Sequence, residues 1–341
     1  MGVAISDIIP KEPIDLDTLN NKIIAIDAHN FLYQFLTSLR QPDGSYLTNS
    51  KGQVTSHLLG LFNRTATLMQ KGIKCVFVFD GEPPELKKQE RERRRALKEQ
   101  AQVYFDQAKE DENQADMKKY ASRTTKLTSE MIEDAKRLIK AMGLPIIQAP
   151  SEGEAQAAYM QQRGDVDYVA SQDADALLFG AKSVIKNLSI AGKRKKTGKL
   201  AYTTILPELI KLDATLNELG IDQKKLIYLS IFTGCDFAIG GIKGIGPKKA
   251  LKLVKEHDEF DTIAQELEWS FEYPPSTVYK TFTQIPIQRE YTLTYKPINE
   301  QELLQITIDE FEFSKDRVQT TLKKIQKANQ QLEQKGLGDF F

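Results

Sequence analysis

The sequence has few cysteines and no surplus of either charge. Its two cysteines, Cys75 and Cys235, give neither a paired disulfide framework nor a Cys/His zinc spacing, which favours a reducing intracellular compartment. Lys and Arg together number 47, and Asp and Glu also number 47, so the chain has no overall cationic field. Any affinity for nucleic acid must therefore come from local segregation of charge.

Long apolar runs are also missing. No segment approaches the roughly 18 apolar residues that a membrane span needs. Charged side chains are already frequent in residues 1–30, which argues against a signal peptide; they include Asp7, Lys11, Glu12, Asp15, Asp17 and Asp27. We therefore expect a soluble, cytoplasmic protein that does not bind a membrane. With 341 residues, the chain could form one large α/β domain or two smaller ones.

Three short apolar runs, residues 22–26, 75–79 and 168–170, have the composition of β-strands. The segments between them are long enough for helical crossovers, which predicts a parallel sheet. An aspartate follows each run closely: Asp27, Asp80 and Asp173. Ligands of open α/β sheets bind outside the carboxyl ends of the strands, so these three acids could meet in one crevice. Alternatively, each could be a turn former or a helix cap.

Four more carboxylates occupy suggestive positions: Glu152, Glu154, Asp175 and Asp236. Seven acids in one site would repel one another strongly, so the cluster makes physical sense only with hard divalent cations, Mg²⁺ or Mn²⁺ rather than zinc. A competing interpretation exists for Glu154, because Ser151 and Glu154 have the spacing of a helix capping box. Both glutamates can reach one cluster only if the helix N-terminus faces the site, which Gly153 would ease.

Two further segments carry cations. Sixteen of the twenty-eight residues from Glu85 to Glu112 are charged, which predicts a helical excursion outside the core. One helical face there would hold four cations, Lys87, Arg91, Arg94 and Lys98, although a solvated face interleaved with glutamates is an equal alternative. Residues 240–250 fit neither a Walker A loop nor a dinucleotide fingerprint. They predict a hairpin that enters a lysine-rich helix through Pro247 and suits a DNA phosphate, unless it is an ordinary helix connection.

The last eight residues end in Phe340 and Phe341, after Gly336 and Gly338. The glycines favour a flexible, detached segment, and paired terminal aromatics favour a short motif that inserts into a pocket of a partner protein.

Taken in order, these motifs resemble the flap endonucleases of the structure-specific 5′ nuclease superfamily. The resemblance runs nearly end to end, and its motifs are Met1-Gly2, Asp27-Ala28, Tyr33-Gln34-Phe35-Leu36, Phe79-Asp80-Gly81, Pro150-Ser151-Glu152-Gly153-Glu154, Ser171-Gln172-Asp173 with Asp175, Gly244-Ile245-Gly246-Pro247-Lys248, and Gln334, Leu337, Phe340 and Phe341. The family implies an α/β fold: a central, mostly parallel sheet flanked by helices, with a helical arch and a helix-two-turn-helix DNA-binding element, the PIN-like or 5′ nuclease fold.

For the active site, the resemblance implies two Mg²⁺ ions, with Mn²⁺ as a substitute. One ion would be held by Asp27, Asp80, Glu152 and Glu154, and the other by Asp173, Asp175 and Asp236. Lys87 and Arg94 match the family's catalytic cations on the arch, and Tyr33 matches its base-stacking residue. The implied activity is cleavage at the base of 5′ flaps together with 5′-3′ exonuclease action, in Okazaki fragment maturation and long-patch base excision repair.

For partners, the resemblance implies branched DNA, the sliding clamp PCNA and a monomeric chain. The remaining DNA contacts would be Arg40, Arg64, Gly234, Gly244, Gly246, Lys248 and Lys249, with K⁺ a further candidate ligand of the 244–249 hairpin and residues 55–57 on the 3′-flap side. Clamp binding would use Gln334, Leu337, Phe340 and Phe341. The arch, from Glu85 to about Tyr120, should be mobile without DNA.

The same resemblance divides the chain into five regions. We expect an N-terminal nuclease region at 1–98, the arch or linker at 99–125 continuing from about 85, and an internal nuclease region at 126–258 with the helix-two-turn-helix at about 225–256. A C-terminal packing region at 259–332 and a clamp-binding tail at 333–341 follow. The chain departs from the family pattern at His29-Asn30, Ala174 and Cys235, none of which removes an acid or a cation. No long basic tail follows the clamp motif, which favours an archaeal source over a eukaryotic, nuclear one.

Two other functions compete with the nuclease. A small-molecule phosphohydrolase would need an Asp-x-Asp pair after the first strand, but Ala28 and His29 follow Asp27. A DNA-binding scaffold without activity would be favoured by a missing acid, and none is missing.

Overall fold

The computed structural model describes residues 5–111, 113–195 and 202–338. Its centre is a seven-stranded sheet with the order β1-β9-β6-β5-β2-β3-β4. These strands are β1 (Glu12–Pro13), β9 (Glu208–Lys211), β6 (Ser183–Lys186), β5 (Tyr168–Ala170), β2 (Ile23–Asp27), β3 (Lys74–Phe79) and β4 (Ile146–Gln148). Strands β6, β5, β2, β3 and β4 run parallel, and β9 is antiparallel to both β6 and β1. The mostly parallel α/β fold is therefore confirmed. The three strands predicted from apolar runs are β2, β3 and β5, which are neighbours.

Helices cover both faces of the sheet. Successive strand residues point to opposite faces, so in β3 Val76 and Val78 join one buried cluster while Phe77 and Phe79 join the other. The Phe77 face is covered by α1 (Ala28–Ser38), α2 (Ser56–Gln70), α5 (Ser129–Ala141), α13 (Glu300–Leu304), the π-helical turn η4 (Gln305–Glu310) and α14 (Lys315–Gly338). The Val76 face is covered by α6 (Gly153–Arg163), α7 (Asp175–Leu178), α8 (Leu212–Leu219), α9 (Gln223–Thr233), α10 (Pro247–Glu256), α11 (Phe260–Glu266) and α12 (Pro275–Thr283).

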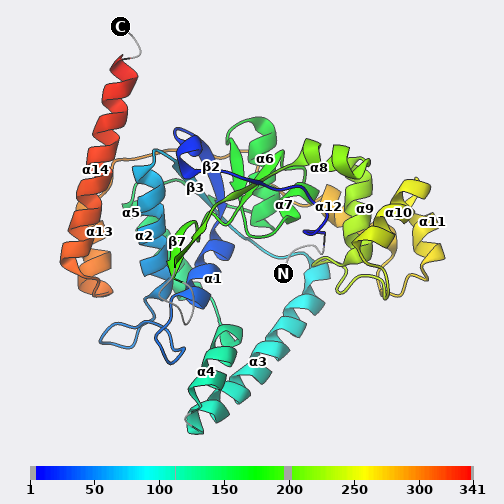
Figure 1. Ribbon diagram of the computed structural model, residues 1–341, viewed down its shortest axis with the longest axis horizontal. Coiled ribbons are helices and arrows are strands. Elements are labelled where there is room, and N and C mark those ends of the chain that lie inside the picture. Colours follow the sequence, from blue (N-terminus) through cyan, green and yellow to red (C-terminus); the bar gives the residue numbers. More distant parts are fainter. Residues whose placement is uncertain (1–4, 112, 196–201, 339–341) are drawn as a thin grey trace.

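A pair of helices, α3 (Lys88–Glu110) and α4 (Gln114–Ala121), projects from the body and is called the arm below (Figure 1). The short turn η2 (Glu85–Lys87) joins it to the sheet side of the molecule. Ala101 and Ala108 are buried within the arm, and the rings of Tyr104 and Tyr120 stack at 5.2 Å. This confirms the helical excursion that the charged segment predicted. With so few apolar side chains, the arm cannot bury enough surface to join the core.

The link between α9 and α10 is a tight hairpin. Gly241 has a φ of 63°, and a Cβ there would lie 2.4 Å from the carbonyl oxygen of Phe232, so only glycine fits. Ile242 N donates to the same carbonyl at 2.8 Å. Pro247 then takes the first turn of α10, as predicted.

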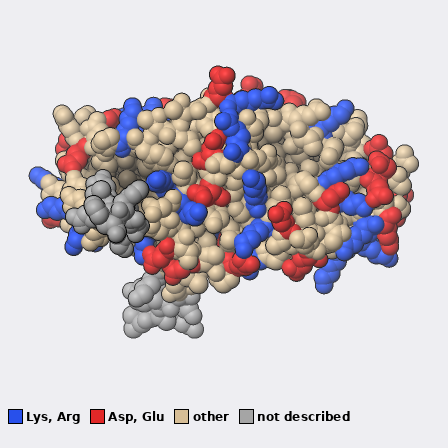
Figure 2. Space-filling model, turned by 90° about the horizontal axis from the view of Figure 1, so that it is seen from above, with Lys and Arg blue, Asp and Glu red and all other residues tan. Residues whose placement is uncertain are grey.

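The C-terminal segment differs from its prediction in the part that is described. Helix α14 runs through Gly338, although Gly336 and Gly338 favoured a flexible segment. Phe340 and Phe341 lie outside the described residues. Elsewhere, patches of Lys and Arg are interspersed with patches of Asp and Glu over the face seen in Figure 2. In the part of the chain that the structure covers, no helix has the length and apolar character of a membrane span. A smaller hairpin pairs β7 (Gly192–Lys195) with β8 (Tyr202–Ile205).

Candidate active site

The three strand-end aspartates meet at one edge of the sheet. Asp27 ends β2 and caps α1, where its Oδ1 accepts from Asn30 N at 3.0 Å. Asp80 follows β3, and its backbone N donates to His29 Nδ1 at 3.1 Å. Asp173 follows β5, and its Oδ2 accepts from Asn30 Nδ2 at 3.4 Å. Because β5, β2 and β3 are adjacent and parallel, their carboxyl ends bring these acids together. Asp27 does cap a helix, but capping does not remove it from the site.

The N-terminus of α6 faces this edge and delivers two glutamates. Gly153 N donates to Asp80 Oδ1 at 2.7 Å, and a Cβ at Gly153 would lie 2.8 Å from the same oxygen. A larger residue at this position would force either the Asp80 carboxylate or α6 to shift. The capping box is not formed, because Ser151 Oγ and Glu154 Oε1 are both buried without a hydrogen-bond partner. The alternative interpretation of Glu154 as a cap is therefore wrong.

Asp175 and Asp236 complete the acidic cluster, by which we mean the seven carboxylates together. Asp175 begins α7, and its charge is one of the causes that raise the pKa of Glu154. Asp236 lies in the hairpin after α9, where Lys87 Nζ approaches its Oδ2 at 3.2 Å and Arg94 Nη2 donates to its Oδ1 at 2.6 Å. Lys87 Nζ also donates to Glu152 Oε2. Lys87, the residue that caps the N-terminus of α3, thus bridges Glu152 and Asp236, and Arg94 brings a second cation from α3 to Asp236.

Titration behaviour reflects this crowding. Burial raises the pKa of Asp27 well above its ordinary value, and the charge of Asp80 adds to it. Burial also raises the pKa of Glu154 well above its ordinary value, followed by the charges of Asp175 and Asp27. Burial raises the pKa of Glu152 too, an effect that Lys87 only partly offsets. Since Asp27, Glu152 and Glu154 resist ionisation in this setting, these three acids favour either protons or bound cations.

The donor set suits a hard divalent metal. All seven side chains offer carboxylate oxygens, and Glu154 Oε1 is a buried acceptor with no donor. Within the residues that are described, however, no three acidic, histidine or cysteine side chains converge tightly enough to form a ready-made ligand shell. The carboxylates gather on one edge, and Lys87 and Arg94 supply part of the neutralising charge.

The side chains predicted to contact DNA near α1 and α2 are engaged within the protein. Tyr33 Oη donates to Thr125 O at 2.6 Å and accepts from Lys98 Nζ. Arg40 Nη2 donates to Thr125 Oγ1 at 2.6 Å, and its Nε and Nη1 bind backbone carbonyls. Arg64 donates to two carbonyl oxygens, of Ser189 at 2.9 Å and of Ala191 at 2.6 Å. These arginines hold the loops around them.

Residues 55–57 are likewise inside the molecule. Thr55, Ser56 and His57 are 5%, 0% and 1% exposed, so none offers a surface to DNA in this conformation. Both ring nitrogens of His57 lack a hydrogen-bond partner, and burial lowers the pKa of His57 to about 4.

The hairpin before α10 is open to solvent, in contrast. A Cβ at Gly244 or Gly246 would meet no atom within 4 Å. Lys248 and Lys249, in the first turn of α10, are exposed. Gly234 turns at a φ of 112° against Gly240 and Gly241, and so shapes the hairpin from inside. Exposed amides and a positive helix end together form a surface that a phosphate can approach.

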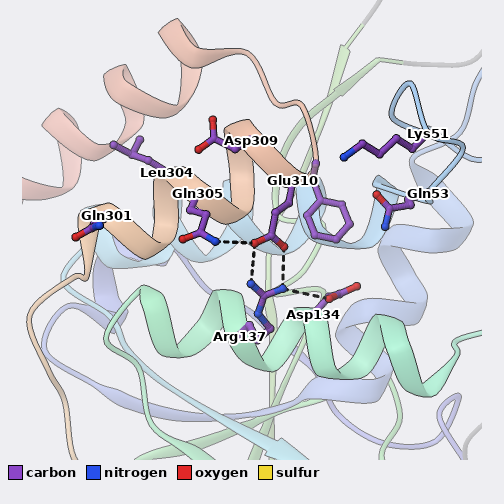
Figure 3. Close-up of a pocket in the computed structure, with 10 residues that line it drawn as sticks. Lys51, Gln53, Asp134, Arg137, Gln301, Leu304, Gln305, Asp309 and Glu310 are labelled. Carbon is purple, nitrogen blue, oxygen red and sulfur yellow. Dashed lines mark hydrogen bonds and ion pairs between the residues drawn. The ribbon is translucent and has the colours of Figure 1, made fainter.

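A separate hollow lies between α5 and the α13–η4 turn, within the helical layer that covers the Phe77 face of the sheet (Figure 3). Arg137 crosses its floor and donates to both carboxylate oxygens of Glu310, at 2.8 and 2.9 Å. Lys51 and Gln53 form the opposite wall. None of the seven clustered acids lines this hollow. We therefore place the candidate active site at the carboxyl ends of the parallel strands and not in this hollow.

The sequence analysis missed two side chains of this site. Glu90, interpreted as part of a solvated face, is only 3% exposed and binds both Arg93 and Arg94. Its spacing of three and four residues from two arginines was the available signal. His29, noted as a departure from the family pattern, accepts the Asp80 amide hydrogen. No local pattern could have indicated that contact, because His29 lies in the first turn of α1 and Asp80 follows β3, about fifty residues later in the sequence.

An acidic cluster at the carboxyl edge of a mostly parallel sheet, bridged by cations from a projecting arm, defines the class of α/β nucleases that cut phosphodiesters. The XPG N-terminal domain family matches residues 4–101, and the XPG I-region family matches residues 143–236. Flap endonuclease 1 of Pyrococcus horikoshii is 48% identical over 341 residues, covering 100% of this chain and 98% of the relative. Flap endonuclease 1 of Pyrococcus furiosus is also 48% identical over 341 residues, with coverage of 100% and 99%.

Solved structures agree with these relatives. Flap endonuclease-1 from Methanococcus jannaschii superposes with a TM-score of 0.75 at 39% identity, covering 96% of this chain and 98% of that one. The catalytic core of Rad2 in complex with DNA substrate has a TM-score of 0.71 at 23% identity, covering 95% and 100%, and shows the shared fold. The chain belongs to the flap endonuclease family.

Proposed function

We propose that this protein is a structure-specific nuclease that hydrolyses DNA at the base of 5′ flaps and also acts as a 5′-3′ exonuclease. The observation that carries the proposal is the acidic cluster, gathered from segments between Asp27 and Asp236 directly beneath the cationic arm. Okazaki fragment maturation and long-patch base excision repair are the processes that such an activity serves. The buried free thiols of Cys75 and Cys235 support an intracellular setting.

Two Mg²⁺ ions, or Mn²⁺ in their place, are the proposed cofactors. Asp27, Asp80, Glu152 and Glu154 would hold one, and Asp173, Asp175 and Asp236 the other. The chemistry that paired ions supply to such a site is activation of water and neutralisation of the leaving oxygen. The orphaned Glu154 Oε1 and the raised pKa values of Asp27 and Glu154 support this assignment, because each marks an acceptor that lacks a counter-charge.

Lys87 and Arg94 are the proposed catalytic cations. Both lie against Asp236, so they already point at the cluster from the arm. A scissile phosphate that entered the site would offer them anionic oxygens in place of these carboxylates, and both would then neutralise charge on the phosphate. Their hold on Asp236 is a resting contact in this view.

The proposed duplex contacts lie mainly at the α9–α10 hairpin. Gly244 and Gly246 offer open backbone, and Lys248 and Lys249 add positive charge; K⁺ is a candidate ion between hairpin and phosphate. Arg40, Arg64 and Gly234 are proposed to act indirectly, by holding the loops that meet DNA. Tyr33 is proposed to stack on a base once Lys98 releases it. The PCNA contact is proposed for Gln334, Leu337, Phe340 and Phe341.

The proposal is tested with a labelled 5′-flap duplex, with and without Mg²⁺, and with the cut position mapped to the nucleotide. Cleavage at the flap base that requires the metal is the expected result. The rival phosphohydrolase predicts turnover of a generic phosphate ester and no cut at the junction, and that pattern would replace the nuclease assignment.

A further inference from the structure

Glu90 is unusual in the arm because its side chain is buried. Helix α3 is rich in charge and largely exposed, yet the Glu90 side chain is only 5% exposed. Among the described residues, Glu90 at 3% and Asp27 at 8% have the lowest exposed fractions of any glutamate or aspartate. A buried carboxylate is costly unless donors satisfy it, so the partners of Glu90 explain why it is tolerated.

Two arginines share this one carboxylate. Arg93 makes a fork, with Nε donating to Oε2 at 2.7 Å and Nη2 to Oε1 at 2.8 Å. Arg94 Nε donates to the same Oε1. Burial acts to raise the pKa of Glu90, but hydrogen bonds and charge from Arg93 and Arg94 outweigh it and hold the pKa below its ordinary value. Glu90 is thus a charged acceptor.

The contact to Arg94 controls where a catalytic cation points. A guanidinium group is planar and rigid, so fixing Nε fixes the direction of both Nη groups. With Nε on Glu90, Arg94 Nη2 reaches Asp236 Oδ1 at 2.6 Å. One edge of Arg94 is therefore anchored in the arm, and the other edge faces the acidic cluster.

We propose that Glu90 is a positioning residue for cleavage, which holds Arg94 Nε so that the Nη edge of Arg94 faces the scissile phosphate. This role rests on the proposed function of Arg94. When DNA replaces Asp236 as the partner of the Nη edge, the Glu90 contact stays, and the guanidinium keeps its orientation without a search among rotamers. Glu90 touches neither DNA nor metal in this role.

The competing interpretation is helix stabilisation, since ion pairs three and four residues apart stabilise helices by a few tenths of a kcal/mol. Arg93 distinguishes the two. It makes the two-bond fork with Glu90, and among the described residues it makes no hydrogen bond or ion pair with a clustered acid, although the charge of Asp236 acts on it. If Glu90 only stabilised α3, Arg93→Ala and Glu90→Gln would have similar effects on cleavage. If Glu90 positions Arg94, Glu90→Gln should be much worse.

The test measures single-turnover cleavage of a 5′-flap duplex at saturating DNA, together with the Kd for the flap. Glutamine keeps the size of Glu90 but removes its negative charge and replaces one acceptor oxygen with a donor, so the two arginines lose the charged acceptor that they share. We expect Glu90→Gln to lower the rate by roughly tenfold to a hundredfold, the cost of misplacing a catalytic group by about 1 Å, with little change in Kd. Glu90→Asp, which keeps the charge, should recover part of the loss. Exposed Glu99 pairs with Arg95 on the same helix, so Glu99→Gln is the matched control and should cleave normally.

A double-mutant cycle decides whether Glu90 acts through Arg94. In an Arg94→Ala background, Glu90→Gln should cause no further loss of rate. Additive losses, an unaltered rate in Glu90→Gln, or equal losses in Glu90→Gln and Arg93→Ala would each overturn the positioning role. Thermal unfolding of every variant separates these outcomes from misfolding. Failure of the unmodified protein to cut the flap would instead reject the proposed function itself.

Discussion

At the scale of single residues, the seven carboxylates differ in how much each contributes to the fold in addition to the site. Asp27 and Asp80 have structural duties as well, one as a helix cap and the other as acceptor for the Gly153 amide. Substitution of either would disturb the fold and the site together. Asp175, the half-buried first residue of the short helix α7, is the position we choose for substitution.

We predict that Asp175→Ala lowers flap cleavage by at least about a hundredfold, the usual cost of losing a key electrostatic contact to the transition state, and leaves flap binding largely intact. Single-turnover rates and a binding titration measure the two effects. Asp213→Ala, which removes an exposed aspartate near the start of α8, is the matched control. Retained turnover in Asp175→Ala would remove Asp175 from the metal site.

His57 makes stability depend on pH. Burial lowers the pKa of folded His57 to about 4, against about 6.5 in an unfolded chain. Above about pH 6.5 both states are neutral, but between about pH 6.5 and 4 only the unfolded chain takes up the proton. We predict a loss of about 3 kcal/mol in the free energy of unfolding across that window from this residue.

Urea unfolding at pH 7, 5.5 and 4 measures this slope. Other groups add slopes of their own, so the informative quantity is the difference between the unmodified protein and His57→Gln or His57→Leu. Both variants should lose the His57 part of the slope, whatever they do to stability at pH 7. An unchanged slope in both would show that folded His57 accepts a proton readily.

Residue identities in the acidic cluster could be predicted from the sequence, but their contacts could not. Three apolar strands are each followed by an aspartate: Asp27, Asp80 and Asp173. This pattern predicts that the three carboxylates lie at the same edge of the sheet, because parallel strands end on the same side. The capping box that Ser151 does not form and the burial of Glu90 show the limit of prediction from local sequence spacing. Local spacing gives the same pattern whether a glutamate faces its own helix, solvent or a distant segment, and tertiary packing decides among these.

At the scale of elements, the lysines of α10 should dominate the electrostatic part of DNA binding. Lys248 and Lys249 are exposed beside open backbone at Gly244 and Gly246, and no ion pair with either lysine is seen among the described residues. Each phosphate contact releases counterions, so affinity should fall steeply with salt. The element was predictable because Pro247 and the flanking glycines restrict the backbone locally.

We predict that replacing Lys248 and Lys249 by alanine weakens flap binding and reduces the slope of log Kd against log salt by roughly one to two. Fluorescence anisotropy at several salt concentrations measures the slope. Lys323 and Lys324, adjacent and exposed on α14, are the control pair for alanine substitution. A salt slope unaffected by the α10 change, or lowered equally by the control, would contradict the assignment of this face.

The predicted arm is correct as an element, but its contacts were beyond the sequence. Amphipathic spacing placed Lys87, Arg94 and Lys98 on one face, and the structure sends them to three different partners: Glu152, Asp236 and Tyr33. A helical face fixes direction around its axis only. Which cation meets which acid depends on how the arm leaves the body at η2.

At the scale of the whole molecule, we expect the proposed clamp-binding tail to act separately from the acidic cluster. The acidic cluster draws on residues between Asp27 and Asp236, and none of its described contacts involves α14. We predict that Phe340→Ala with Phe341→Ala leaves cleavage without the clamp unchanged and abolishes stimulation by PCNA. Paired rate measurements with and without PCNA are the check. Stimulation that survives the double change would reject the tail assignment.

The overall architecture was predictable to the level of sheet type and arm, since strand composition and charge density are properties of local sequence. The antiparallel edge formed by β9 and β1 was not, because its strands are short and carry no distinctive pattern. The long extended segment between α12 and α13 was not predictable either, because a distant residue helps to hold it: Lys296 N donates to Gly143 O at 2.8 Å.

The wide sequence separation of Asp27 and Asp236 has a consequence during synthesis. Asp27 is translated early, but Asp236 emerges from the ribosome only after more than half of the polypeptide has been made. A nascent chain therefore carries an incomplete set of acids for most of its translation. Half-made copies of this protein, whether stalled or prematurely terminated, are expected to be harmless to the chromosome.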